Sequence, residues 1–212
     1  MVKVKICGLS TLEAVDAAID AGADFIGLVF FAKSPRNVSL PKARELAGRA
    51  RGRVKIVALI VDADNAAITS IGDTVKPDYF QAHGSETPER VVEIRNLTNK
   101  PVIKAIKVAD AADVSQAAGY EGKAALILYD AKAPEALLDA LPGGNGIAFD
   151  WGLLANSTDF MLSGGLNPEN IANAIRTTGA PIVDVSSGVE SAPGIKDLTF
   201  IRKFIERAKS AS

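Results

Sequence analysis

The sequence predicts a single domain, residues 1–212, that folds as a closed (β/α)8 barrel (a TIM barrel). Short apolar segments of the kind that form buried strands recur eight times, and segments with helical spacing separate most of them. Strand and helix repeated eight times in 212 residues are most simply arranged as a closed parallel barrel. No linker or low-complexity tract divides the chain, so we expect one domain.

The expected strands are near-continuous apolar runs, mostly rich in β-branched residues. They do not alternate between polar and apolar residues, which is typical of parallel strands covered by helices. In chain order they are expected at residues 2–7, 25–30, 55–61, 79–82, 102–106, 124–129, 160–162 and 182–185.

Apolar residues at helical spacing predict the helices between these strands. The three stripes are Leu12, Val15, Ala18 and Ile19; Val91, Val92, Ile94 and Leu97; and Ile171, Ala174 and Ile175. Ser10 and Glu13 have the spacing of a capping box, and Asn167 before Pro168 predicts another helix start. Glycine marks two of the expected helix ends, at Gly22 and Gly119.

A doubly wound sheet is the competing fold. It would usually need fewer strands and a glycine-rich loop after the first one, whereas Cys7-Gly8-Leu9 stands there. The sixth repeat fits the barrel least well, because its strand leads into residues 130–151, a long stretch with proline and glycine. A compact barrel rarely carries such a loop without a functional reason.

Composition excludes several classes of protein. The 24 Lys and Arg residues nearly balance 25 Asp and Glu, so a net charge of −1 gives no reason to expect nucleic acid or a membrane as partner. The longest apolar runs fall far short of the roughly 20 residues that span a bilayer. Charges near the N-terminus argue against a signal peptide. One cysteine and one histidine predict neither a disulfide nor a zinc cluster, and we expect a cytoplasmic protein.

Two loops at the expected C-terminal end of the barrel have the pattern of a phosphate site. Gly164 and Gly165 follow the seventh strand and precede a helix, and Ser187 and Gly188 follow the eighth. Glycines let the backbone approach an anion closely, and N–H groups at a helix start complete such a site. The alternative is that these glycines only form tight turns, but barrels commonly bind phosphate after strands seven and eight.

Cys7 and Asp130 form a candidate acid–base pair at the same end of the barrel. They follow the first and sixth strands, so they can flank a bound sugar from different sides. A thiolate is a competent base and a protonated carboxyl a competent acid. Each also has a structural interpretation, because a free cysteine is most often a small buried hydrophobe and an aspartate often caps a helix or turn.

Six motifs occur in order over nearly the whole chain. They are Lys5-Ile6-Cys7-Gly8, Ser34-Pro35-Arg36, Gln81-Ala82-His83-Gly84, Gly143-Gly144-Asn145-Gly146 with Phe149-Asp150-Trp151, Leu162-Ser163-Gly164-Gly165-Leu166, and Asp184-Val185-Ser186-Ser187-Gly188-Val189-Glu190 followed by Pro193-Gly194 and Lys196-Asp197. Together they resemble the phosphoribosylanthranilate isomerase family. Ala82 and Asn145 depart from the usual leucine and threonine of that family, and neither change touches Cys7, Arg36 or Asp130.

The resemblance implies an aldose–ketose isomerase that catalyses an Amadori rearrangement, the third step from chorismate to tryptophan. N-(5-phosphoribosyl)anthranilate would become 1-(2-carboxyphenylamino)-1-deoxyribulose 5-phosphate. By the same resemblance Cys7 is the general base, Asp130 the general acid, and Arg36 the group that holds the anthranilate carboxylate. It implies no cofactor and no metal, and its only implied partner is the phosphorylated small-molecule substrate. A monomer and a homodimer both remain open.

His83 and Asp184 lie near the barrel mouth by position, and we expect them to orient their neighbours rather than react. Reference pKa values of about 8.5 for cysteine and about 3.9 for aspartate favour a thiol and a carboxylate at neutral pH. The proposed chemistry needs the opposite pair. We expect Arg36 and helix N-termini to favour the Cys7 thiolate.

Two other functions would also fit a barrel with these phosphate-binding loops. The histidine-pathway isomerase performs the same rearrangement on a different aminoaldose, but its family uses aspartates for both acid and base, so Cys7 argues against it. A non-catalytic phosphosugar-binding barrel would keep the glycine loops and lose Cys7 or Asp130. Both residues are present.

Overall fold

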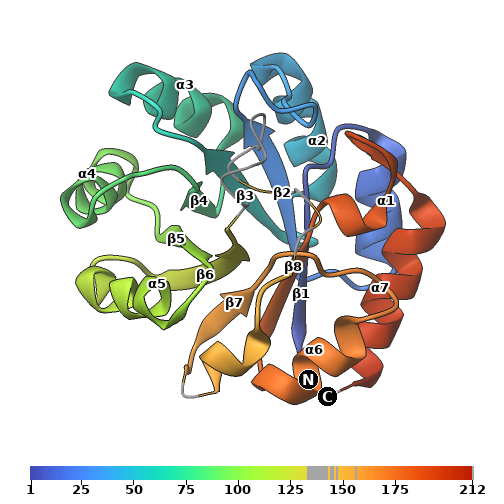
Figure 1. Ribbon diagram of the computed structural model, residues 1–212. Coiled ribbons are helices and arrows are strands. Elements are labelled where there is room, and N and C mark those ends of the chain that lie inside the picture. The colour runs from blue at the N-terminus through green and yellow to red at the C-terminus, as the bar shows by residue number, and fades with distance from the viewer. Residues whose placement is uncertain (133–142, 144–145, 147, 156, 212) are drawn as a thin grey trace.

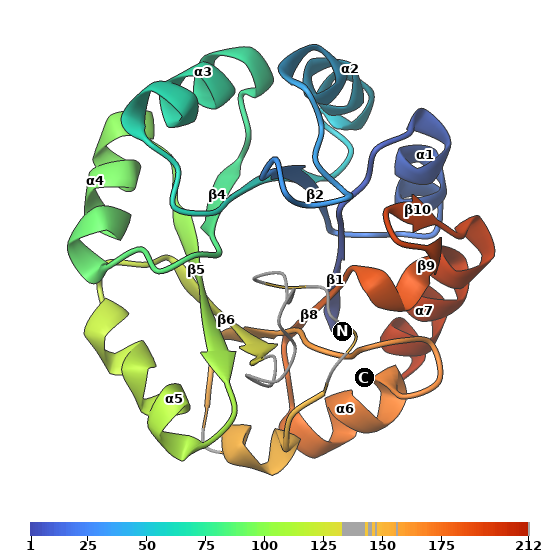
Figure 2. The ribbon, with the colours of Figure 1, turned by 45° about the horizontal axis from the view of Figure 1, so that its top comes forward.

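Eight parallel strands close into a barrel in the order of the sequence, and helices surround it (Figures 1 and 2). This arrangement confirms the predicted (β/α)8 fold. The computed structural model describes residues 1–132, 143, 146, 148–155 and 157–211. The barrel strands are β1 (Lys3–Cys7), β2 (Phe25–Phe30), β3 (Lys55–Ile60), β4 (Tyr79–Ala82), β5 (Val102–Val108), β6 (Leu126–Ala131), β7 (Phe160–Leu162) and β8 (Ile182–Val185).

Helices follow most strands and form the outer ring (Figure 2). They are α1 (Leu12–Asp20), α2 (Leu40–Ala50), α3 (Asn65–Val75), α4 (Pro88–Thr98), α5 (Ala111–Ser115), α6 (Ile171–Thr178) and α7 (Leu198–Ser210), with 3-10 helices η1 (Gln116–Tyr120), η2 (Trp151–Leu154) and η3 (Ser187–Val189). A short hairpin of β9 (Glu190–Ala192) and β10 (Ile195–Lys196) follows η3. Among the described residues, no helix is long and apolar enough to cross a membrane.

The barrel strands are buried on both faces, which explains their near-continuous apolar sequences. Successive side chains of a strand point to opposite faces. One set packs against the helices, as Val4 and Ile6 of β1 do in the main apolar cluster. The other set fills the barrel interior and includes Phe25, Val57, Ile103, Ala105, Leu128 and Met161. This inner cluster supports the barrel end where the strands finish.

Strands β5 and β6 extend further than the sequence predicts. The sixth strand was expected at residues 124–129 but spans Leu126–Ala131, and the fifth continues to Val108. Their added residues pair with one another, Lys107 with Asp130 and Val108 with Ala131. The prediction that Asp130 follows its strand is therefore wrong. Asp130 lies on β6, where the sheet fixes its backbone.

Two helix starts also differ from the prediction. Thr11, not Ser10, caps α1, because its side chain accepts a hydrogen bond from Ala14 N. Helix α6 begins at Ile171 rather than at Pro168. The Asn167 side chain instead accepts from the backbone N–H groups of Glu169 and Asn170, which shapes a turn ahead of the helix.

One of the two predicted helix ends and most of the predicted apolar stripes are confirmed. Gly22 directly follows the C-cap of α1 with a φ of 92°, a conformation that favours glycine. Gly119 lies inside η1 and ends no helix there. Leu97 is 42% exposed and does not belong to the buried stripe of α4, whereas Ile171, Ala174 and Ile175 of α6 are buried. The long stretch expected at residues 130–151 falls mostly outside the described residues, as does Asn145.

The inner cluster should dominate stability. Replacing Leu128, fully buried inside the barrel, by Ala should lower the free energy of unfolding by about 2–5 kcal/mol, because a cavity remains in a closed barrel. The matched control is Leu97→Ala on the surface of α4, which should change it by no more than about 0.5 kcal/mol. Urea unfolding followed by circular dichroism measures both. Equal effects of the two substitutions would contradict this account of the core.

Candidate active site

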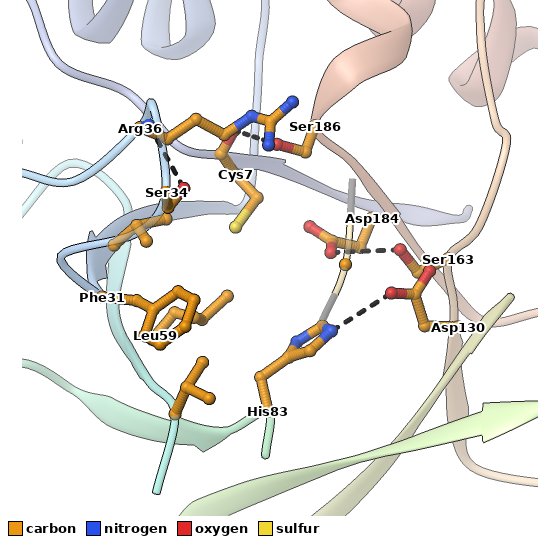
Figure 3. A pocket seen from close by; sticks show the side chains of 13 residues that line it. Cys7, Phe31, Ser34, Arg36, Leu59, His83, Asp130, Ser163, Asp184 and Ser186 are labelled. Atoms are coloured by element: carbon orange, nitrogen blue, oxygen red, sulfur yellow. Dashed lines mark hydrogen bonds and ion pairs between the residues drawn. The ribbon is translucent and has the colours of Figure 1, made fainter. Parts of the chain in front are cut away.

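The C-terminal ends of the strands surround a pocket that contains most of the predicted site residues (Figure 3). Its lining includes Cys7, Arg36, His83, Asp130 and Asp184. A second pocket shares part of this wall and is lined by Gly164, Gly165 and Ser187, among others. The barrel thus brings together residues from both ends of the chain.

Cys7 is the last residue of β1, and its side chain is almost fully buried in the pocket wall. The neighbouring strand makes room for the sulfur. Gly27 is the register partner of Cys7 on β2, and a Cβ atom at that position would lie 2.7 Å from Sγ. Only glycine leaves space for the thiol here, so the position of the Cys7 side chain depends on Gly27.

Burial raises the pKa of the Cys7 thiol, and the nearby cations Lys5 and Lys196 oppose this effect without overcoming it. Asp184 raises the pKa further. Burial thus outweighs the cations, and the pKa of Cys7 lies above its usual value in this pocket. The cations that act most on the sulfur are buried lysines, rather than the Arg36 guanidinium or a helix N-terminus.

Asp130 lies across the pocket from Cys7 and is held by two neighbours (Figure 3). Its Oδ1 accepts from Ala131 N at 3.0 Å, and its Oδ2 lies 3.1 Å from His83 Nε2. The other ring nitrogen of His83 lies 2.7 Å from Gln81 Nε2. Gly143 covers this pair, since a Cβ there would lie 2.6 Å from His83 Nε2. His83 thus contacts Asp130 directly.

The Gln81 side chain completes this buried chain of polar groups. Its Oε1 atom is buried and has no hydrogen-bond partner among the described residues. An unpaired buried amide oxygen is costly, so its place next to His83 requires an explanation.

Arg36 is fixed by an ion pair that the sequence did not indicate. Its Nε and Nη2 donate to the two carboxylate oxygens of Glu190, at 2.7 and 2.9 Å. Lys196 donates to Glu190 Oε1 at 2.7 Å and to Ser186 O at 2.9 Å. Burial acts to raise the pKa of Glu190, but Arg36 and Lys196 outweigh it and keep that pKa below its usual range. Hairpin β9–β10 supplies both Glu190 and Lys196.

Asp184 faces the pocket from β8 and forms a buried ion pair with Lys5. The two residues are register partners on adjacent strands, and Lys5 Nζ lies 2.8 Å from Asp184 Oδ1. Ser163 Oγ donates to Asp184 Oδ2 at 3.4 Å. Lys5 is fully buried in the barrel interior.

The loops after β7 and β8 present backbone N–H groups to the second pocket. Gly164 and Gly165 have positive φ values of 88° and 64°. No described residue accepts a hydrogen bond from the N–H groups of these glycines or of Ser187 and Gly188. Such groups suit an anion.

Gly188 also has a purely structural role. A Cβ atom there would collide with the carbonyl oxygen of Leu166. Glycine at this position is needed for the close approach of two loops, so a larger residue would disturb the backbone whether or not an anion binds. A bulkier residue at Gly188 would therefore not report on phosphate contacts alone.

Five polar residues of the site with buried side chains were not assigned a role from the sequence, namely Lys5, Gln81, Ser163, Glu190 and Lys196. A signal existed for two of them, because Lys5 and Gln81 are polar residues inside otherwise apolar strand segments. Among the described residues, no group of three or more His, Cys, Asp or Glu side chains is arranged to hold a metal ion.

Known proteins resemble this chain over nearly its full length. The model of the family described as N-(5'phosphoribosyl)anthranilate (PRA) isomerase matches residues 4–207. The N-(5'-phosphoribosyl)anthranilate isomerase of Rhizobium meliloti (strain 1021) is 53% identical over 212 residues, which cover 99% of this chain and 98% of that protein. The protein of the same name from Parvibaculum lavamentivorans is 50% identical, with 99% of each chain covered.

Solved structures agree with these sequence matches. Phosphoribosyl anthranilate isomerase from Thermotoga maritima superposes with a TM-score of 0.88 at 37% identity, covering 99% of this chain and 100% of that one. A phosphoribosyl anthranilate isomerase in complex with reduced 1-(o-carboxyphenylamino)-1-deoxyribulose 5-phosphate has a TM-score of 0.86 at 36% identity, with the same coverage. From the family match and these relatives, we conclude that the chain belongs to the PRA isomerase family.

Proposed function

We propose that this chain converts N-(5-phosphoribosyl)anthranilate to 1-(2-carboxyphenylamino)-1-deoxyribulose 5-phosphate, an Amadori rearrangement of tryptophan biosynthesis. The observation that carries the proposal is the pair of Cys7 and Asp130 on opposite sides of one pocket. Family membership and the similar isomerase that binds a reduced aminoketose phosphate support it.

In the proposed mechanism Asp130 is the general acid and Cys7 the general base. Asp130 protonates the furanose ring oxygen, and the ring opens to a protonated Schiff base. Cys7 then removes the proton from C2 of the sugar, which yields an enolamine that tautomerises to the ketone. Proton transfers by positioned side chains contribute roughly 10²–10⁴-fold each to such reactions.

The neighbours of Asp130 can support both of its protonation states. With its proton on Nε2, His83 donates to the Asp130 carboxylate while its Nδ1 accepts from the Gln81 amide. In the other tautomer, His83 Nδ1–H donates to an amide oxygen and Nε2 accepts from a protonated Asp130. Turning the Gln81 amide over would bring its unpartnered Oε1 to Nδ1. We propose that this second arrangement carries the acid form.

The substrate's two anionic groups are assigned to the two ends of the site. Arg36 lies in the wall of the first pocket, held in plane by Glu190, and a planar guanidinium suits a carboxylate. We assign the anthranilate carboxylate to Arg36, where it would bind beside the groups that the guanidinium now contacts or take their place. The phosphate is assigned to the N–H groups of the loops after β7 and β8.

We propose that this protein is located in the cytoplasm, because a general base with a free thiol benefits from a reducing compartment. The isomerase of Thermotoga maritima is described as dimeric, with monomeric forms generated from it. A monomer or a homodimer is proposed for this chain, and light scattering distinguishes them.

The acid–base assignment is tested by removing each group. Cys7→Ala and Asp130→Asn should each lower kcat by about 10²–10⁴-fold, because each variant lacks one proton transfer, while product affinity stays near wild type. The decay of anthranilate-derivative fluorescence measures turnover. Asp113→Asn, a buried carboxylate outside the pocket, is the matched control and should keep normal kcat. Near-normal turnover of either site variant removes that residue from the mechanism.

The same assay separates the alternative functions. A histidine-pathway isomerase would turn over its own aminoaldose in preference, and a non-catalytic barrel would bind the product without turning over substrate.

The proposed role of Gln81 is tested by its replacement. Gln81→Met removes the partner of His83 Nδ1, so the tautomer that donates to the Asp130 carboxylate is favoured and the acid form is lost at lower pH. Because the reaction draws on the form with a thiolate and a protonated carboxyl, the acid limb of the pH profile of kcat/KM should move down by about one unit. The value of kcat/KM should then be about tenfold lower above that limb and unchanged below it. A loss of the same size at every pH would indicate a purely structural role instead.

The phosphate assignment is tested by introducing a charge. Ser187→Asp places a carboxylate in the second pocket and should raise KM for substrate by at least about tenfold, since like charges about 4 Å apart repel by several kcal/mol near a protein surface. Ser191→Asp, on the exposed hairpin close by, is the control. If KM and competitive inhibition by inorganic phosphate both stayed at wild-type levels in Ser187→Asp, the phosphate would bind elsewhere.

A further inference from the structure

We propose that Lys5 is a positioning residue for the base: its buried ammonium group is the counter-ion of the Cys7 thiolate, and Asp184 competes with the sulfur for that ammonium. The inference rests on the proposed role of Cys7 and extends it to a charge that lies beneath the pocket. Its test does not require turnover.

The sheet places the three groups together. Lys5 and Cys7 are alternate residues of β1, so both side chains point into the barrel, with Lys5 one layer below the sulfur. Asp184 is the register partner of Lys5 on β8, at 2.8 Å from its ammonium. Asp184 and Cys7 line the same pocket, and their side chains face it from adjacent strands (Figure 3).

Burial explains why a lysine is held here. Lys5 is fully buried, and an ammonium without a partner would be very costly inside the barrel. Asp184 neutralises it while Cys7 is a thiol. When Cys7 loses its proton, two anions share one cation, and the positive charge of Lys5 favours the thiolate. The lysine thus reduces the cost of forming a thiolate in a closed pocket.

The other charges near the sulfur are arranged differently. Lys196 on β10 also favours the thiolate, but its ammonium is bound to Glu190, which Arg36 contacts as well. His83 and Asp130 face Cys7 across the pocket. Lys5 differs because its carboxylate partner, Asp184, itself lines the pocket beside Cys7.

The chain contains a single cysteine and three tyrosines, and ionised tyrosine absorbs close to the thiolate band in the ultraviolet. The absorbance of Cys7 is therefore obtained as the difference between each protein and the same protein carrying Cys7→Ala. The titration is compared among wild type, Asp184→Asn and the double variant Lys5→Met/Asp184→Asn, all without substrate. Asp184→Asn should lower the pKa of Cys7, because the sulfur becomes the sole anionic partner of Lys5. Adding Lys5→Met should raise the pKa of Cys7 again by at least about one unit. The thiolate fraction at pH values below the midpoint is then about tenfold smaller.

This sequence of shifts separates a charge effect from a structural one. Loosened packing would move Cys7 in the same direction in both variants, whereas the proposal requires opposite directions. The control is Lys104→Met/Glu86→Gln, which removes an equally buried ion pair of 2.9 Å on the β4–β5 side and should leave the titration unchanged. If the Lys5→Met/Asp184→Asn variant fails to fold, Lys5→Gln/Asp184→Asn is used in its place, because glutamine keeps a polar group at position 5.

The outcomes for Lys5 and for the base are distinguishable. No change on adding Lys5→Met, or a further fall in the pKa of Cys7, overturns the proposal. If the titration shifts as expected but the basic limb of the pH profile of kcat/KM does not follow it in the same variants, the Lys5–Cys7 pair stands and the role of Cys7 as base fails.

Discussion

Closure of the parallel barrel is the constraint on which the rest of this structure depends. Alternate side chains of every strand must point into one narrow interior, and those nearest the strand ends converge on a single pocket. The lower interior is filled by apolar side chains such as Val57 and Leu128, which hold the strands in register. Polar and charged groups are placed above this layer. The candidate active site is thus the upper continuation of the core.

The charges of this upper layer are buried, so each is held by a partner. Lys5 pairs with Asp184, and Glu190 pairs with both Arg36 and Lys196. Such pairs recover little net stability, because two charges must be removed from water. Their value here is positional. A side chain held by a buried ion pair loses freedom that substrate binding would otherwise have to remove.

The proposed chemistry needs a Cys7 thiolate and a protonated Asp130. Burial raises the pKa of the Cys7 thiol, and Asp130 lies within hydrogen-bond distance of Ala131 N and His83 Nε2. The neighbours that can change this balance are Lys5 for the sulfur and the His83–Gln81 pair for the carboxyl. Two sets of positioning residues, on opposite sides of the barrel, thus correspond to the two proposed proton transfers.

The sequence by itself determined the barrel, the bounds of all eight strands to within two residues at each end, Cys7 at the end of the first strand, and the loops that carry Arg36 and the glycine turns. These features follow from local apolar pattern and motif, which neighbouring residues encode. Tertiary structure alone decided that β6 reaches Ala131 and carries Asp130, since that depends on pairing with β5. It also decided the Lys5–Asp184 pair, whose members are 179 residues apart, and the contact of Arg36 with hairpin β9–β10. Strand register and the meeting of distant side chains arise only when the sheet closes, because no local pattern specifies which residues become neighbours across it.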